Sequence, residues 1–371
     1  ETDLRDKVSG IGLAPTAHGK ASLKMLQKRE CCMQTARVIC CVIGMTLLFL
    51  PVARAEESVF PATRSFTATD SLDVGDEPSP DARECLAGLA WEAAAFDVDL
   101  EEARLDRGDV LVRYPSPVSS GDVRNDRVAM EWYVARDDTS SPCSAPAVVV
   151  VHESGSGMTA GRFIARGLQR RGLHTFLLHL PFYGERRTGR SRPDNVDLPT
   201  VIRQAIADVR RARDAVAVLP MIDHRHIALQ GTSLGGFVCA TAAGLDDGFE
   251  SVFLLLAGGD LYDLIQTGSR DTAKVREKLK EAGLANERLR SLTQIIEPTR
   301  IAHRINPAAT WLYSGTHDSV VPIRNAVVLA EAAGLDNVHH IRMPANHYSG
   351  VIFLPLVLDH IDRKIRLLHE P

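Results

Sequence analysis

The chain has 371 residues, of which 45% are hydrophobic and 24% charged, and its formal net charge is −4. A polypeptide of this length and composition can bury a large core, as globular proteins do. The charge is small for the size and the body of the chain contains no long basic run, so nothing points to nucleic acid or an acidic polymer as the partner.

The first part of the chain, residues 1–55, has the pattern of a leader that contains a secretory signal peptide. Met33 opens a short basic head, residues 38–52 are nearly all apolar, and Ala53-Arg54-Ala55 matches the small-residue pattern before a cleavage point. The apolar run, about 15 residues, is shorter than the ~20 that a spanning helix needs. We expect translation to start at Met33, with Met25 as the alternative, and cleavage after Ala55. The mature chain would then be exported, periplasmic or secreted, without a stable membrane span.

Residues 56–95 predict an arm or linker rather than a domain. Ser, Thr, Pro and Asp dominate residues 58–81, and a short helix follows over 82–95. The helix contains Cys85, which could pair with Cys143 in an oxidising compartment, although the sequence does not show that the two meet. A third cysteine, Cys239, is interpreted as a buried free thiol.

From residue 96 onward the pattern predicts antiparallel strands and then alternating strands and helices. The leading strands are expected at 96–105, 110–114 and 128–134, the first two joined as a hairpin. Apolar runs predict buried strands at 147–151, 173–180, 226–230, 251–256, 309–313 and 338–343. Helical periodicity marks 159–171, 198–218, 237–243 and 351–368. Strands that are apolar on both faces and alternate with helices predict a mostly parallel sheet covered on both sides, an α/β fold.

The stretch Gly231-Thr232-Ser233-Leu234-Gly235 joins one of these strands to the next helix. Strand, sharp turn and helix around G-x-S-x-G are the context of a nucleophile elbow, in which Ser233 carries a hydroxyl lifted clear of the sheet. The two outer glycines lack the Cβ that would clash in so close a turn. The Leu234 N–H, at the start of the helix, would point at an oxyanion. Alone, the pentapeptide also fits an ordinary glycine-rich turn.

Two later loops make a stronger pattern. One strand is followed by Gly315-Thr316-His317-Asp318, and the last strand by Pro344-Ala345-Asn346-His347. From about residue 110 to 368 the chain resembles the α/β-hydrolase superfamily, whose catalytic residues run Ser, then Asp or Glu, then His. The resemblance implies Ser233 as nucleophile, His347 as base and Asp318 as acid. Asp260 is the alternative acid, because some members carry it after the preceding strand, and Asp318 could instead cap the next helix.

Two more loops are expected to border the same site. The loop His152-Glu153-Ser154-Gly155 resembles the family's His-Gly loop, but Glu153 stands where glycine is common. We therefore expect the second oxyanion donor at Ser154, with Gly155 as the alternative and a flexible turn as the structural explanation. The segment 181–187 resembles a P-x-Y-G-x-R segment of dienelactone-hydrolase-like and peptidase-like enzymes. Tyr183 would line the substrate pocket, and Arg186 or Arg187 would meet an anionic group or else tie the loop down by ion pairs.

The resemblance implies one α/β-hydrolase domain over 96–371, with a helical cap inserted over about 259–306, before the strand that carries the acid. His224 and His226 have no cysteine or carboxylate cluster at ligand spacing, so neither a metal nor another cofactor is expected. The function implied is an exported serine hydrolase that cleaves a small-molecule carboxylic ester through an acyl-enzyme. A prolyl-oligopeptidase-like peptidase and a catalytically silent hydrolase fold that serves as a binding protein are the alternatives.

Overall fold

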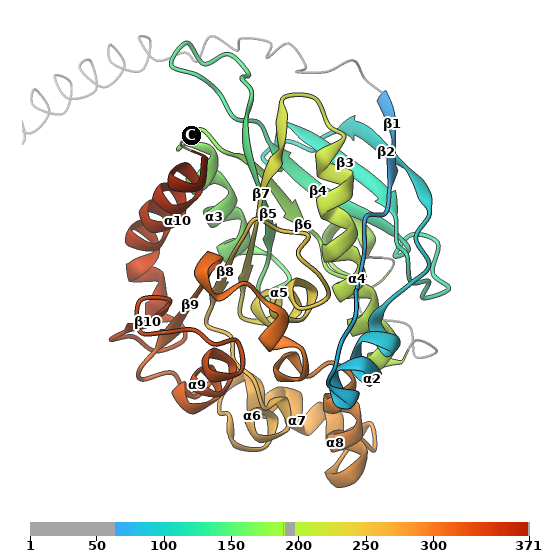
Figure 1. The fold of residues 1–371 in the computed structure, drawn as a ribbon, viewed down its shortest axis with the longest axis vertical. Coiled ribbons are helices and arrows are strands. Elements are labelled where there is room, and N and C mark those ends of the chain that lie inside the picture. Colours follow the sequence, from blue (N-terminus) through green and yellow to red (C-terminus); the bar gives the residue numbers. More distant parts are fainter. Residues whose placement is uncertain (1–63, 188, 190–196, 370–371) are drawn as a thin grey trace, which may run out of the picture. The chain divides into compact units, whose positions relative to one another are not determined.

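The computed structural model describes residues 64–187, 189 and 197–369. The predicted leader, with its start at Met33 and its cleavage after Ala55, lies outside these residues. The described part contains a sheet of ten strands in the order β1-β2-β3-β4-β6-β5-β7-β8-β9-β10 (Figure 1). The strands are β1 (Arg64–Thr69), β2 (Ala95–Glu102), β3 (Val110–Pro115), β4 (Arg127–Tyr133), β5 (Ala145–Val151), β6 (His174–Leu178), β7 (Ile222–Thr232), β8 (Ser251–Leu255), β9 (Thr310–Gly315) and β10 (His340–Met343).

The sheet is antiparallel at one side and parallel through the rest. Strands β1 to β4 form successive antiparallel pairs, and β4 pairs antiparallel with β6. The strands from β6 through β5 to β10 are all parallel neighbours. The predicted hairpin between β2 and β3 and the mostly parallel sheet are therefore confirmed. Because parallel strands end at a common edge, the loops that follow β5, β7, β9 and β10 meet there.

Helices cover both faces of the sheet. In chain order they are α2 (Pro80–Leu89), α3 (Thr159–Gln169), α4 (Leu198–Ala217), α5 (Leu234–Ala243), α6 (Leu261–Thr267), α7 (Asp271–Glu281), α8 (Asn286–Ile295), α9 (Ile323–Ala332) and α10 (Leu354–His369). Helices α3 and α10 share one buried cluster, and α2, α4, α5 and α9 share the cluster on the other face (Figure 1). The three helices between β8 and β9, α6 to α8, lie together at the lower end of the view. They form the predicted cap.

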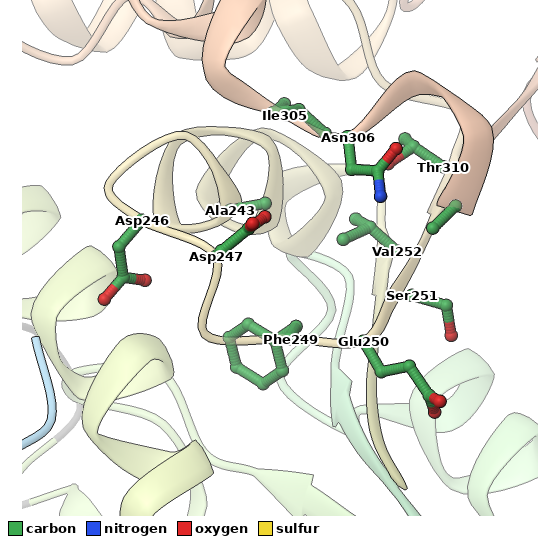
Figure 2. Close-up of a pocket in the computed structure, with 11 residues that line it drawn as sticks. Ala243, Asp246, Asp247, Phe249, Glu250, Ser251, Val252, Ile305, Asn306 and Thr310 are labelled. Carbon is green, nitrogen blue, oxygen red and sulfur yellow. The ribbon is translucent and has the colours of Figure 1, made fainter. Parts of the chain in front are cut away.

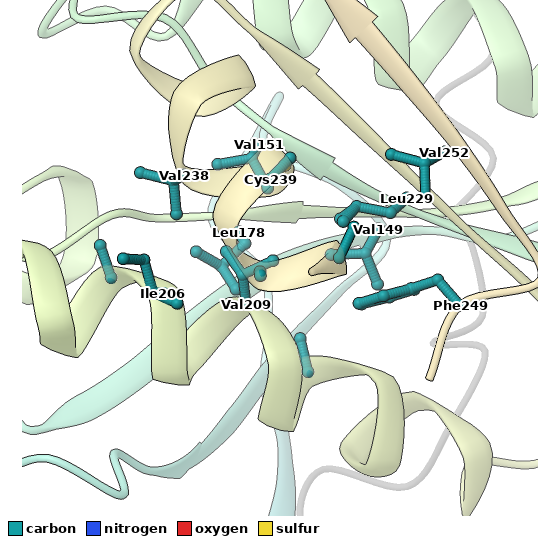
Figure 3. Packing of buried hydrophobic residues seen from close by; sticks show 14 of the residues in the cluster. Val149, Val151, Leu178, Ile206, Val209, Leu229, Val238, Cys239, Phe249 and Val252 are labelled. Carbon is teal, nitrogen blue, oxygen red and sulfur yellow. The ribbon is translucent and has the colours of Figure 1, made fainter. Parts of the chain in front are cut away.

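The core follows from the apolar strands and from one face of α4. Figure 3 shows Ile206 and Val209 of this helix, which belong to the same buried cluster as Val149 and Leu229 of the sheet. All four side chains are fully or almost fully buried. Cys239 of α5 lies in the same cluster, and burial raises the pKa of its thiol well above the usual value. Such a thiol is an inert packing group, as the sequence predicts.

The prediction of an arm or linker over 56–95 is wrong at residues 64–69, which form a strand, whereas the short helix predicted over 82–95 is present as α2. Residues Arg64–Thr69 form β1, which pairs in register with β2, and Pro80–Leu89 form α2. The side chain of Asp70, just after β1, accepts a hydrogen bond from the Trp91 indole N–H and forms a buried ion pair with Arg211 of α4. Composition hid this strand because an edge strand with one solvated face can be rich in Ser and Thr. Its stability comes from backbone hydrogen bonds and from the inward-facing Phe66 and Ala68.

The possible disulfide is also absent. Cys85, Cys143 and Cys239, the cysteines of the described ranges, are all free thiols. Cys85 packs among the buried residues of α2, where burial raises its pKa to about 11. None of the helices described has both the length and the apolar content that a bilayer crossing needs.

Candidate active site

Ser233 occupies the sharp turn between β7 and α5. Its backbone angles are φ 52° and ψ −116°, a conformation that costs a non-glycine residue about 1–3 kcal/mol. The turn is held by close packing: a Cβ on Gly231 would come within 2.4 Å of the Gly235 carbonyl oxygen. A Cβ on Gly235 would come within 2.3 Å of the Val151 carbonyl oxygen. The strain is thus fixed by its surroundings, and it presents the Ser233 hydroxyl at the edge of the sheet.

The structure brings the three predicted site residues together. The Ser233 Oγ lies 3.0 Å from His347 Nε2, and His347 Nδ1 lies 2.7 Å from Asp318 Oδ2. The second carboxylate oxygen, Oδ1, accepts hydrogen bonds from the Val320 and Val321 N–H groups at 2.8 and 3.0 Å. Because Nδ1 faces a carboxylate, it carries the imidazole proton, and Nε2 is left to accept the hydrogen bond that the Ser233 hydroxyl donates.

The alternative acid, Asp260, has a different task. It is the N-cap residue of α6, where its Oδ1 accepts a hydrogen bond from the Asp263 N–H at 3.1 Å. Its own N–H donates to Glu297, and its side chain is exposed. The structure therefore places Asp318, not Asp260, against the imidazole of His347.

A cavity of about 270 Å³ opens beside the Ser233–His347 contact. At one end it is bordered by Ser154, Ser233, Leu234 and His347. Elsewhere its walls are mainly apolar side chains from α4, α5 and the three cap helices, together with the loop after Asp318. Concave apolar sites with a few convergent polar groups are the usual form of small-molecule sites.

Comparison with known proteins identifies the fold. No protein-family model and no curated protein matches the chain. Among solved structures, the acetyl xylan esterase from Paenibacillus sp. R4 matches with a TM-score of 0.54 and 16% identity, over 80% of this chain and 96% of that one. An α/β-hydrolase from Penicillium sp. sh18 gives 0.49 and 13%, over 69% and 97%. Acetyl xylan esterase 1 from Thermoanaerobacterium sp. JW/SL YS485 gives 0.48 and 13%, over 75% and 92%.

The likeness to the Paenibacillus structure extends over nearly all of that protein. The chain has the α/β-hydrolase fold. The predicted fold class is confirmed. In this α/β-hydrolase fold the helices α6 to α8 stand between β8 and β9, as predicted for the cap.

The glutamate that departs from the expected His-Gly loop stabilises the next helix. Glu153 accepts hydrogen bonds from the Ala160 and Gly161 N–H groups, at 3.2 and 3.1 Å, in the first turn of α3. A carboxylate at a helix N-terminus is favourable because it pairs with unsatisfied N–H groups and with the helix dipole. The side chain is thus occupied by α3, and the loop backbone remains free to border the cavity at Ser154.

The neighbouring His152 is a buried, neutral anchor that the sequence analysis did not single out. Its Nδ1–H donates to the Glu153 carbonyl oxygen at 2.5 Å, and its Nε2 accepts from the Leu180 N–H at 3.1 Å. Burial lowers its pKa to about 3, so the ring stays uncharged near neutrality. The ring also packs on Tyr183, with the centroids 4.7 Å apart. The sequence placed this histidine in the loop that resembles the His-Gly loop, but it did not show the role of the ring, because that role depends on burial.

Neither of the two predicted substrate-binding residues lines the cavity: Tyr183 contacts the loop that contains Ser154, and Arg186 is buried elsewhere. The Tyr183 hydroxyl donates to the Ser154 carbonyl oxygen at 3.1 Å, and its ring is not among the side chains that line the cavity. Arg186 is fully buried; its guanidinium forms an ion pair with Asp208 of α4 at 2.7 Å and donates to the Asn125 carbonyl oxygen. The expectation that Arg186 meets an anionic substrate is wrong, because its charge is already paired inside the protein.

The cap is tied to the loops that carry the acid and the base. Thr272 of α7 donates its hydroxyl to the Val320 carbonyl oxygen at 2.8 Å, beside Asp318. Tyr348, which follows His347, donates its hydroxyl to Asp271 of α7 at 2.7 Å. Hydrogen bonds from Lys274 and Tyr348 lower the pKa of the Asp271 carboxyl, so this group is ionised at neutral pH. The residues at the start of α7 therefore help to hold both loops in place.

A second hollow lies at the other edge of the sheet and is too small for a substrate. It is bordered by Ser251 and Thr310, the first residues of β8 and β9, and by Asp246 and Glu250 (Figure 2). Its volume is about 10 Å³, no more than a single water molecule occupies. Within the described residues, no group of three or more His, Cys, Asp or Glu side chains could hold a metal ion. The cavity beside Ser233 is accordingly the candidate site.

Proposed function

We propose that the protein is a serine hydrolase that cleaves carboxylic esters through an acyl-enzyme. The observation that carries this proposal is the continuous contact from Ser233 Oγ through the His347 imidazole to Asp318, at 3.0 and 2.7 Å, beside an apolar cavity. A serine hydroxyl is a weak nucleophile near neutral pH and needs such a base. The His347 side chain is 11% exposed and that of Asp318 is 1% exposed, so the carboxylate acts in a largely dry environment.

The chemistry assigns a role to each group. As the Ser233 oxygen bonds to the ester carbonyl carbon, its proton passes to His347 Nε2. The tetrahedral intermediate collapses, the bond to the alcohol oxygen breaks, and the alcohol leaves with the proton from His347. Water then attacks the acyl-enzyme with the same imidazole as base, which releases the acid and restores Ser233. Asp318 keeps the proton on Nδ1 and stabilises the imidazolium that forms in both steps.

Two backbone N–H groups are suited to bind the oxyanion. Leu234 is the first residue of α5, so its N–H has no partner within the helix. For Ser154 the argument is one of peptide geometry, because C=O and N–H point in opposite directions across a planar trans peptide. The Glu153 carbonyl is turned inward to the buried His152 ring, so the Ser154 N–H in the same peptide is turned away from the core. Ser154 lines the cavity, which supports its N–H as the second donor.

The ester class is also supported by one neighbour in fold. The Paenibacillus protein is named an acetyl xylan esterase, and we extend to this chain the bond type that it cleaves, not its substrate. Because the sequence predicts a signal peptide, we also propose that the mature protein is exported.

A peptidase would use the same catalytic groups. The hydrolysis rates of nitrophenyl esters and aminoacyl amides separate an esterase from a peptidase, and the proposal requires the esters to be hydrolysed faster.

Active-site labelling tests the proposal against a silent fold. A fluorophosphonate probe should label the wild-type protein, the modified peptide should contain Ser233, and labelling should abolish hydrolysis of a nitrophenyl ester. The Ser233→Ala variant should take up no label, because the reagent needs the activated oxygen. Absence of label on the wild type, under conditions that label a control esterase, would refute the proposed function.

His152→Phe is expected to lower kcat about 10- to 100-fold with little change in KM. The substitution keeps a ring of similar size but removes the hydrogen bond that turns the Glu153–Ser154 peptide. Loss of a single oxyanion donor costs about 10²–10³-fold in kcat, and a displaced donor costs less. The effect should fall on kcat, because this interaction strengthens only in the transition state. Steady-state kinetics on a nitrophenyl ester gives both constants.

The control for this variant is His174→Phe. His174 of β6 is likewise buried and neutral, its pKa lowered to about 4, and it binds the Cys143 carbonyl oxygen away from the cavity. Loss of either histidine should lower the melting temperature, but only the His152 variant should lose kcat. Equal kcat losses in the two variants would show that His152 contributes stability alone.

A further inference from the structure

We propose that the ester has a long, uncharged, apolar acyl group, and that the cavity under α6, α7 and α8 binds this group. The inference rests on the proposed function and adds the substrate class. The acyl chain would run from Ser233 between α4 and α5 on one side and the cap helices on the other. Four observations carry the proposal: the apolar walls, the engaged hydroxyls, the lack of a cationic side chain among the described lining residues and the position of His347.

The walls of the cavity are hydrocarbon over most of their surface. Helix α4 contributes Ile202 and Ile206, α5 contributes Phe237 and Val238, and the cap adds Ile265 and Leu292 among others. A sugar or another polyol placed here would lose its hydrogen bonds to water without replacing them, which is costly. An alkyl chain has no hydrogen bonds to water to lose, and the transfer of each methylene out of water is favourable.

The polar groups deeper in the cavity are already engaged. Three threonines line it, and each donates its hydroxyl to a backbone carbonyl: Thr241 to Phe237 at 3.1 Å, Thr272 to Val320 at 2.8 Å and Thr293 to Arg290 at 2.9 Å. A hydroxyl donates a single proton, and these protons are directed at the protein. The cavity therefore offers a ligand few donors apart from the groups around Ser233.

The charges around the cavity exclude an anionic acyl group. No lysine or arginine is among the described residues that line it. The ionisable carboxylate in the lining is Asp271, which hydrogen bonds to Tyr348 and Lys274 keep charged. A carboxylate or phosphate on the acyl chain would find no counter-charge among the described lining residues and would be repelled by Asp271. A neutral chain meets neither cost.

The position of His347 decides which half of the ester enters. The leaving alcohol must face His347, because it takes its proton from that imidazole. The residues that follow in the chain, Tyr348, Val351 and Ile352, are exposed, which supports a solvent-facing alcohol. The acyl half then faces the rest of the lining, which α4, α5 and the cap helices provide. The acyl chain is thus the buried part and the alcohol is the solvent-facing part.

The test is a panel of nitrophenyl esters from acetate to hexadecanoate, on the full chain. We expect kcat/KM to rise about fourfold for each methylene buried, reach a maximum between butanoate and dodecanoate, and then fall. A parallel panel of acetates with increasing alcohol length should show little change. A preference for acetate, or a response to the alcohol length alone, would overturn the proposal.

Two variants locate the chain in the cavity. Ile202→Trp and Ile265→Trp, both at half-buried positions in the lining, should shift the optimum to shorter acyl groups. Val328→Trp on α9, an exposed valine outside the cavity, is the matched control and should leave the profile unchanged. Two positions protect the test from a single variant that fails to fold. An unchanged optimum in both folded variants would place the chain elsewhere.

A binding measurement separates failure of this inference from failure of the proposed function. The Ser233→Ala protein should bind methyl decanoate, monitored by displacement of a neutral fluorescent probe, and bind methyl acetate or the decanoate anion at least tenfold more weakly. This result does not require turnover. If the wild-type protein is labelled by the fluorophosphonate but prefers acetate, the inference is refuted and the proposed function stands. If the wild-type protein is not labelled but Ser233→Ala still binds methyl decanoate, the proposed hydrolase function is refuted and the apolar binding site stands.

Discussion

Asp318→Asn is expected to lower kcat for ester hydrolysis by about 10⁴-fold, the loss that this change of tautomer causes in serine hydrolases with the same three groups. The amide oxygen can keep the hydrogen bonds from the Val320 and Val321 N–H groups, so the fold should survive. The amide nitrogen then faces His347 Nδ1, which must accept a hydrogen bond and lose its proton. The proton moves to Nε2, and the imidazole can no longer accept one from Ser233.

Asp260→Asn is the matched control, because the sequence left this residue as the rival acid. An asparagine oxygen can still accept the hydrogen bond from the Asp263 N–H and cap α6, so folding and activity should both be preserved. Single-turnover and steady-state kinetics on the same nitrophenyl ester give kcat for both variants. If Asp260→Asn lost the activity and Asp318→Asn kept it, the assignment of the acid would be reversed.

The three central residues could be predicted because each follows directly on a parallel strand. Ser233 follows β7, Asp318 lies just after β9 and His347 just after β10. Apolar runs reveal such strands, and parallel strands bring their carboxyl ends to one edge whatever the length of chain between them. The structure brings these side chains to within hydrogen-bonding distance of one another. Local sequence and topology predicted that these loops meet at one edge, and the resemblance to the α/β-hydrolase superfamily supplied the three residues and their roles.

The same reasoning did not predict the features that depend on burial. Strand β1 is polar by composition and gains its order from pairing with β2. Glu153 looked like a defect in an oxyanion loop, but its carboxylate binds the first turn of α3. The cap was predicted, but the sequence did not show that hydroxyls such as that of Thr272 would donate to backbone carbonyl oxygens. Each depends on a partner that is distant in sequence, which spacing alone does not identify.

Arg186→Met is expected to lower the free energy of unfolding by about 3–5 kcal/mol, because it leaves a buried charge without its partner. In the native protein the guanidinium is fully buried, 2.7 Å from the Asp208 carboxylate, and it also donates to the His179 and Asn125 carbonyl oxygens. Methionine replaces the stem of the side chain but none of these contacts. Chemical denaturation at fixed pH measures the loss.

Two control variants distinguish a structural role of Arg186 from the substrate-binding role that the sequence suggested. Arg187→Met, at the exposed neighbouring position, should change stability by no more than about 0.5 kcal/mol. The double variant Arg186→Met, Asp208→Leu should recover much of the loss, because an apolar pair removes both charges together. If Arg186→Met kept wild-type stability and instead raised KM for an anionic ester, the arginine would be a substrate-binding residue.

The pH dependence of the stability loss in Arg186→Met provides an independent test of the ion pair. Burial already raises the pKa of the Asp208 carboxyl, and Arg186 opposes that rise, so removing the arginine raises the pKa further. A carboxyl whose folded pKa lies above its unfolded pKa holds its proton more tightly in the native state. Its contribution to stability is therefore present at low pH and is lost as the pH rises through the folded pKa. The deficit of Arg186→Met should be smaller at mildly acidic pH than at mildly basic pH, and substitution of Asp208 should abolish this difference.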